Sequence, residues 1–275
     1  VRNFNFLQII NKFSPTDFHP PLYYLLMKLW TNIFGHSEVA LRFPSIIFSL
    51  LTGIFVYRIA KLLNGYIAGF WSALFFLFNP LIVYYSQEAR MYMMVTFFLT
   101  ASLYFFILNI KNKISKIQIK NQIFFNLFIL LSLLTFYGSA FLVASFLLYF
   151  LYKKQYKNLF ISLFSLFIYF LTISPLLNHQ LINSKIVLSN VANWSMTLGK
   201  ANIKNLLLIP LKFSVGRISF YPKWLYWGIA GIWMGFVGYL LIQKSKVKSQ
   251  KLNSKVKSLI YLLILPLILG FLASF

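Results

Sequence analysis

The sequence has very few acidic residues. Its 275 residues include three, Asp17, Glu38 and Glu88, against 26 Lys and Arg. Soluble domains carry roughly 25% charged residues, whereas this chain has 11%, so it cannot cover a water-facing surface. A chain so poor in carboxylates does not use them for solubility. If the three lie on one side of a membrane, they are the first candidates for its chemistry.

Cysteine is absent as well. This absence excludes a disulfide framework and leaves the redox compartment undetermined. The formal net charge of +23 would indicate nucleic acid only if a soluble fold displayed a basic face. Here the lysines stand between long apolar runs. We therefore expect membrane lipids, and no nucleic acid, among the partners.

Long apolar runs make up most of the chain, and hydrophobic residues account for 60% of it. A helix needs about 20 apolar residues to cross the hydrocarbon of a bilayer. The sequence therefore predicts an all-α fold, a polytopic transmembrane helical bundle of about eight spans that forms a single domain over residues 1–275. The expected spans are residues 43–61, 66–85, 91–110, 122–136, 139–152, 158–177, 224–242 and 259–275.

Positive charges predict the orientation of the bundle. Cytoplasmic loops carry an excess of Lys and Arg, and four alternate loops hold fifteen of these residues without an acid. The opposite, external face then receives residues 1–42, which hold interfacial helices, the turn 86–90 and the loop 178–223. Six spans lie within 43–177 and two within 224–275. The fifteen charges are Arg58, Lys61, Lys111, Lys113, Lys116, Lys120, Lys153, Lys154, Lys157, Lys244, Lys246, Lys248, Lys251, Lys255 and Lys257.

Two acidic residues of the first external segment have basic neighbours. Asp17 and His19 precede Pro20-Pro21, which allows a helix to begin but not to extend backwards. That helix is too short to span, so it is predicted to lie along the outer leaflet. Asp17 and His19 either face a common site, or Asp17 caps the helix while His19 packs locally. Glu38 and Arg42 are four residues apart, which favours an ion pair anchoring a helix end.

The third acid, Glu88, lies two residues before Arg90 in a very short turn between two expected spans. One interpretation is that Glu88 caps the following helix and complements its dipole. The other is functional, because a carboxylate at the bilayer surface beside an arginine and close to Tyr85 marks a site more often than a cap.

Three motifs carry a family resemblance. They read DFHPPLYY at residues 17–24, FGHSEVALRFPS at 34–45 and YYSQEARMY at 84–92. Their order, spacing and intervening helices over residues 15–110 closely resemble the GT-C membrane glycosyltransferases, in particular the protein-mannosyltransferase-like branch (family 39 and its bacterial relatives). Beyond residue 120 the resemblance is looser.

The resemblance implies a membrane glycosyltransferase. Such an enzyme takes a sugar from a polyprenyl-phosphate carrier and transfers it to an acceptor glycan, lipid or protein at the external face of the plasma membrane. Direct displacement would invert the anomeric centre, and the sequence offers no candidate for a covalent nucleophile. Glu88 and Asp17 would be its catalytic residues. The residues expected to bind the substrate and its phosphate are His19, Arg90, Arg42, Glu38 and Tyr85.

The resemblance also bears on metal use and on completeness. Some relatives bind a divalent metal ion and others work without one; here Glu88, Asp17 and His19 would be the ligands, and no other cofactor is expected. The family usually carries an acidic residue on the loop after its first helix. This sequence starts at Val1, downstream of that point. We therefore expect a fragment that lacks the N-terminal helix, with its acid, and the C-terminal part.

Two other classes of function remain open. A flippase or other transporter of lipid-linked sugars would carry ionisable residues inside its spans and repeated helix pairs. The expected spans are nearly free of charge and show no two-fold repeat. A non-catalytic membrane scaffold would be favoured if the full gene lacked the upstream acid.

The predicted orientation can be tested by labelling, since the chain has no cysteine of its own. A cysteine placed at Asn193 should react with a membrane-impermeant maleimide in intact cells, because the loop 178–223 is expected outside. A tag near Lys116 should be accessible only after the membrane is disrupted. Labelling at position 193 only after disruption would place the acids on the cytoplasmic face and refute this orientation.

Overall fold

The protein is built from helices in a computed structural model that describes residues 3–111, 115–190 and scattered positions between 209 and 272. Every regular element in this part of the chain is helical, which confirms the all-α prediction. The elements are α1 (Phe6–Gln8), η1 (Ile9–Phe13), η2 (Ser14–Thr16), α2 (Leu22–Phe34), α3 (Glu38–Asn64), α4 (Tyr66–Leu77), α5 (Pro80–Ser86), α6 (Tyr92–Lys111), α7 (Ser115–Thr135), η3 (Tyr137–Ser139), α8 (Ala140–Tyr152) and α9 (Tyr156–Asn190).

Fewer spans are found than expected. Among the described residues, α3, α6, α7 and α9 are long and apolar enough to cross a membrane, and α4 with α5 would make a fifth span. The predicted count of about eight is not confirmed. The span expected at 139–152 corresponds to α8, whose 13 residues are too few to cross a bilayer. In the spans expected at 224–242 and 259–275 the structure describes separate positions, all of them helical, and these two spans stay predictions.

The span expected at 66–85 is two helices, α4 and α5, bent by 60° at their junction. Pro80 is the first residue of α5 and has no amide hydrogen to continue α4. Asn79 caps the new helix, because its side chain accepts a 2.9 Å hydrogen bond from the Leu81 amide. The prediction of one continuous helix here was wrong.

The helix α9 is longer than predicted. It was expected at 158–177 and continues to Asn190, so the segment 178–190 is helical rather than loop. Pro175 stands inside this helix and leaves the Leu171 carbonyl without its usual amide donor. The Ser174 hydroxyl donates a 3.2 Å hydrogen bond to that carbonyl, which compensates for the missing donor. Residues 191–208, further along the expected external loop, lie outside the described part.

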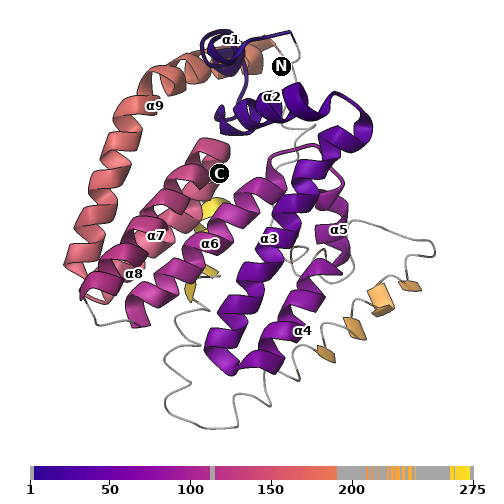
Figure 1. The fold of residues 1–275 in the computed structure, drawn as a ribbon, viewed down its shortest axis with the longest axis vertical. Coiled ribbons are helices and arrows are strands. Elements are labelled where there is room, and N and C mark those ends of the chain that lie inside the picture. The colour runs from indigo at the N-terminus through magenta and orange to yellow at the C-terminus, as the bar shows by residue number, and fades with distance from the viewer. Residues whose placement is uncertain are drawn as a thin grey trace.

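Consecutive helices run up and down, with α6 packed against α3 on one side and α7 on the other. As a result, the helix α2, the turn before α6 and the end of α9 gather at one end of the bundle (Figure 1). The last turn of α3, with Lys61, and the turn after α8, with Lys153, lie at the other end (Figure 1). The arrangement agrees with the expected separation of acids from lysine-rich loops; which end is external stays a prediction.

A proline inside α3 leaves a backbone carbonyl free, and α2 binds to that carbonyl. Gly35, with φ +79°, ends α2, and the Ser37 side chain caps α3. Pro44 lies inside α3 and has no amide to bond the Ala40 carbonyl four residues earlier. The indole nitrogen of Trp30 in α2 donates a 2.8 Å hydrogen bond to this free carbonyl. The backbone defect of one helix thus becomes the attachment point of another.

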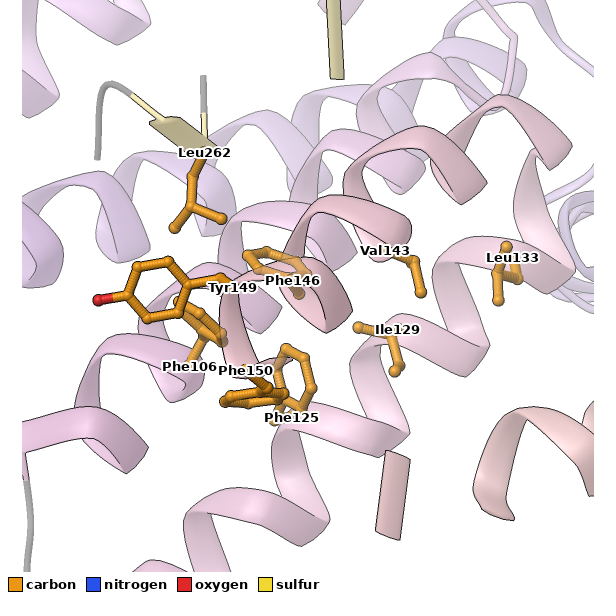
Figure 2. Packing of buried hydrophobic residues seen from close by; sticks show 9 residues of the cluster. All are labelled: Phe106, Phe125, Ile129, Leu133, Val143, Phe146, Tyr149, Phe150 and Leu262. Carbon is orange, nitrogen blue, oxygen red and sulfur yellow. The ribbon is translucent and has the colours of Figure 1, made fainter. Parts of the chain in front are cut away.

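The largest apolar cluster fills the space between α6, α7 and α8 (Figure 2). Its aromatic rings pack closely, with 4.7 Å between the ring centroids of Phe106 and Phe146. Lipid tails are as apolar as these side chains, so such packing stabilises the bundle through van der Waals contact rather than through removal of water. The buried members are Phe106, Phe125, Ile129, Leu133, Val143, Phe146, Tyr149, Phe150 and Leu262.

A buried polar network joins α6, α7 and α9. The Gln122 side chain is its centre: its amide nitrogen donates to the Ser162 hydroxyl at 2.8 Å and to Asn126 Oδ1 at 3.3 Å, and its oxygen accepts from Asn109. Ser162 also donates to Asn126 Oδ1 at 2.9 Å. Interhelical hydrogen bonds of this kind each contribute roughly 0.6 to 2 kcal/mol in membranes, so Gln122 holds three helices together.

Replacing Gln122 should therefore loosen the bundle. Gln122→Leu leaves the buried Asn109, Asn126 and Ser162 side chains short of partners, and the melting temperature in detergent should fall clearly. Gln118→Leu is the matched control: it makes the same change one turn earlier on α7, outside the network. Equal melting temperatures for the two variants would show that the network contributes nothing to stability.

Candidate active site

Asp17 and His19 lie together, as predicted. Asp17 ends the 3₁₀ turn η2, and its Oδ1 is 3.5 Å from Nδ1 of His19. Its other oxygen, Oδ2, accepts a hydrogen bond from the Tyr24 hydroxyl. The helix-cap interpretation of Asp17 was wrong, because α2 begins after Pro21 without a side-chain cap. The side chains of Asp17 and His19 are 22% and 32% exposed, so the pair is partly shielded yet reachable.

These contacts determine the charge of Asp17. Burial alone would raise its pKa, but the close contact with His19 and the hydrogen bond from Tyr24 outweigh burial and bring the pKa below the ordinary 3.8. Burial and the hydrogen bond to Asp17 raise the pKa of Tyr24. At neutral pH Asp17 is therefore a carboxylate, and Tyr24 is a protonated donor to it.

His19 rests against Phe136, which packs on an apolar cluster. The His19 ring stacks on Phe136, with 6.2 Å between ring centroids and 22° between planes. Phe136 follows α7 and packs against a cluster built by α2 and the start of α6. The position of the His19 ring is therefore fixed by packing against Phe136 as well as by its own backbone segment. The buried members of the cluster are Tyr23, Met27, Met91, Met94 and Phe98.

Glu88 is fixed through its backbone. The Ser45 hydroxyl of α3 donates a 2.6 Å hydrogen bond to the Glu88 carbonyl, and the Glu88 amide donates to the Tyr85 carbonyl at 3.3 Å. The side-chain oxygen Oε2 is buried and has no hydrogen-bond partner. A carboxylate that capped a helix would accept from backbone amides there, so this geometry favours the functional interpretation.

Arg90 and Tyr85 lie at the rim of the same turn. The exposed Arg90 donates a long, 3.4 Å hydrogen bond to the Tyr92 hydroxyl, and the Tyr85 and Tyr92 rings meet edge to face at 5.0 Å. The positive charge of Arg90 also counters part of the rise in pKa that burial causes in Tyr23 and Tyr24. The charge of Arg90 therefore reaches Tyr23 and Tyr24 at the start of α2.

Glu38 and Arg42 form a separate ion pair. Their charged atoms are 2.5 Å apart, at positions i and i+4 of the first turns of α3. Both side chains are exposed, at 74% and 48%. The helix-anchoring interpretation is confirmed, and the pair does not join Asp17 and His19. Substrate binding by Glu38 or Arg42 stays a prediction.

The expected metal ligands do not converge. In the described part of the chain, no three side chains of His, Cys, Asp or Glu gather into a group that could hold a metal ion. Asp17 and His19 lie together, and Glu88 does not complete a third position. The fit to a three-ligand site is therefore poor, and the mechanism proposed below uses no metal.

Sequence reasoning missed two residues of this region. Gln180 of α9 is 4% exposed and donates to the backbone carbonyls of Ser14 and His19. Tyr137 donates to Gln180 Oε1 at 2.6 Å. No local pattern marks Gln180, because the two carbonyls that it binds are more than 160 residues away in the sequence, and Tyr137 is 43 residues away. Tyr24, by contrast, was visible in the motif that follows Asp17.

The comparison with known proteins identifies a family whose matched range covers most of this region. A family model described as dolichyl-phosphate-mannose-protein mannosyltransferase matches residues 18–179, more than half of the chain. The chain belongs to this family. No curated protein and no solved structure matches it. Membership of this mannosyltransferase family confirms the resemblance seen in the motifs, and the matched range includes His19, Glu88 and Arg90 and begins directly after Asp17.

Removing the Tyr24 hydroxyl should change the pH dependence of transfer. Tyr24→Phe takes away a hydrogen bond that stabilises the Asp17 carboxylate, so the pKa of Asp17 rises toward its ordinary value or above. Asp17 then loses its charge at a higher pH, and the acidic limb of the rate profile should move upward. Tyr23→Phe, which removes the neighbouring buried hydroxyl, is the control. Superimposable profiles for the two variants would contradict a role of the Tyr24–Asp17 bond.

Proposed function

We propose that this member of the mannosyltransferase family transfers a sugar from a polyprenyl-phosphate-linked donor to an acceptor hydroxyl at the external face of the plasma membrane. The observation that carries the proposal is that one end of the bundle holds two carboxylates with different surroundings (Figure 1). Asp17 is engaged by Tyr24 and faces His19. Glu88 has a buried oxygen without a partner.

The Asp17–His19 pair suits the donor side of the reaction. Asp17 has a lowered pKa and two polar neighbours, so it is a weak base and better fitted to orient His19. With Nδ1 toward Asp17, His19 has Nε2 left for a phosphate oxygen. Negative charge develops on the phosphate as it leaves the sugar, and His19 together with Arg90 would stabilise it.

Glu88 suits the acceptor side. A buried oxygen without a partner is costly unless a ligand supplies a donor, and a hydroxyl of the acceptor would do so. In the proposed step, Glu88 takes the proton of this hydroxyl while the hydroxyl oxygen bonds to the anomeric carbon. The bond between that carbon and the phosphate oxygen breaks, and its electron pair leaves with the polyprenyl phosphate. One displacement of this kind inverts the anomeric centre.

The helix α2 fits a lipid-linked donor. Its buried residues Tyr23, Met27 and Thr31 recur every four positions and face the protein, whereas Leu29 and Ile33 are exposed. A helix with one packed face and one exposed apolar face suits the membrane interface. The candidate residues beside it would then lie at the depth of lipid headgroups, where the phosphate of such a donor is found.

The alternatives explain the site less well. A transporter would place ionisable residues within its spans, yet the one acidic residue in the described spans is Glu38, at the exposed start of α3. A scaffold would gain nothing from a buried carboxylate oxygen without a partner, which costs roughly 1 to 3 kcal/mol or more. A transferase makes use of that oxygen.

The role of Glu88 can be tested by Glu88→Gln, which changes one atom and leaves the backbone bonds to Ser45 and Tyr85 intact. Loss of the proton acceptor should lower kcat by about 100-fold or more, a loss of about 2.7 kcal/mol of transition-state stabilisation. The rate of sugar transfer from a synthetic polyprenyl-phosphate donor should be measured in membranes containing the full chain encoded by the gene.

Gln87→Ala is the control for this variant, because Gln87 is an exposed residue of the same turn. It should transfer sugar at a rate close to that of the unmodified enzyme. Near-normal kcat for Glu88→Gln would remove Glu88 from the reaction and refute the proposed division of roles.

A further inference from the structure

Gln180 ties together the two ends of the segment that carries Asp17. Its amide nitrogen donates to the Ser14 carbonyl at 2.7 Å and to the His19 carbonyl at 3.0 Å. Its oxygen accepts from the Tyr137 hydroxyl at 2.6 Å. Both amide hydrogens and the carbonyl of this buried side chain are therefore used. Asp17 lies between the two carbonyls that Gln180 holds.

We propose that Gln180, oriented by Tyr137, is a positioning residue for the Asp17–His19 pair. The inference rests on the proposed function, because it assigns Gln180 a role in holding groups that act on the donor. Tyr137 selects one of the two amide orientations: with Oε1 toward the Tyr137 hydroxyl, the amide hydrogens face the backbone carbonyls. The reverse orientation would set Oε1 against those carbonyls, which cannot donate.

The segment between Ser14 and Pro21 has few backbone donors of its own, so the two hydrogen bonds from Gln180 matter for holding it in place. Three of its residues, Pro15, Pro20 and Pro21, have no amide hydrogen. The Ser14 carbonyl accepts a long 3.3 Å bond from the Asp17 amide, and for the His19 carbonyl Gln180 supplies the donor. Without Gln180, the His19 carbonyl would lose this donor, and the Ser14 carbonyl would keep the long bond from the Asp17 amide.

Two neighbouring aromatic residues, Phe136 and Tyr137, connect Gln180 to His19. Phe136 stacks on the His19 ring, and the next residue, Tyr137, binds Gln180. The junction between α7 and α8 thus fixes the His19 ring with one side chain and the His19 backbone, through Gln180, with the other. One contact acts on the ring of His19 and the other on its backbone, which favours precise placement over simple attachment of a loop.

Asn183 offers a matched control on the same helix. It lies about one turn beyond Gln180 and donates a 2.6 Å hydrogen bond to the Pro15 carbonyl. It therefore attaches α9 to the same segment but acts at the residue two positions before Asp17. If attachment of the segment were all that mattered, loss of Asn183 or of Gln180 would have similar effects on transfer.

The test compares Gln180→Met with Asn183→Leu, which remove the amides at similar side-chain volume. Small displacements of catalytic groups can cost on the order of 100-fold in rate, so Gln180→Met should lower kcat at least about 10-fold, with little change in KM for the lipid-linked donor. Asn183→Leu should stay within about 3-fold of the unmodified enzyme. Equal losses of kcat in the two variants, or a loss confined to KM, would overturn the positioning role.

Tyr137→Phe provides a milder variant in case Gln180→Met fails to fold. It removes one hydroxyl and should lower kcat in the same direction by a smaller factor, because the Gln180 amide is no longer oriented. Combined with Gln180→Met it should cause no further loss, since Tyr137 acts through Gln180. Additive losses of kcat in the double variant, or normal kcat in Tyr137→Phe, would contradict the inference.

Two further variants separate this inference from the proposed function. Asp17→Asn and Glu88→Gln test the reaction itself, and normal transfer by both would refute the proposed function. If both are inactive while Gln180→Met keeps normal kcat, the proposed function stands and the positioning role of Gln180 is wrong.

Discussion

The first turns of α3 hold both halves of the candidate site. Pro44 cannot bond the Ala40 carbonyl, which instead accepts from Trp30 and anchors α2. The next residue, Ser45, donates to the Glu88 carbonyl. Since α2 carries the Tyr24 hydroxyl that binds Asp17, two consecutive residues of one helix determine where both carboxylates lie. Chemistry that needs two acids in a fixed relation depends on this short stretch of backbone.

The membrane makes unpaired polar atoms conspicuous. No water is present in hydrocarbon to satisfy a buried donor or acceptor, and the polar side chains between α6, α7 and α9 accordingly bond one another. Among the described residues, four buried side-chain atoms lack a hydrogen-bond partner, and two of them, His19 Nδ1 and Glu88 Oε2, belong to the candidate site. The other two belong to Asn109 and Asn121. The two atoms of the candidate site thus belong to ionisable side chains, whereas the two atoms elsewhere belong to side-chain amides.

Local features of the site could be predicted, and distant ones could not. The spacing of Asp17 to His19 and of Glu38 to Arg42 foretold both pairs, because each contact spans four residues or fewer. The break at Pro80 was missed because hydropathy averages over a window in which one proline counts little. Gln180 was missed for another reason: its contacts depend on how α9 returns to the N-terminal segment, which only the packed bundle determines.

The length of α9 bears on how far Gln180 lies from the start of this helix, compared with the thickness of a bilayer. A helix rises about 1.5 Å per residue, so Gln180, which follows the start of α9 at Tyr156, lies about 36 Å along it by that rise. The hydrocarbon core is about 30 Å thick. If α9 enters at one boundary, Gln180 emerges just past the other, at the level of lipid headgroups. On that condition, the length of α9 would bring Asp17, which lies between the two carbonyls that Gln180 binds, to the level of the lipid headgroups.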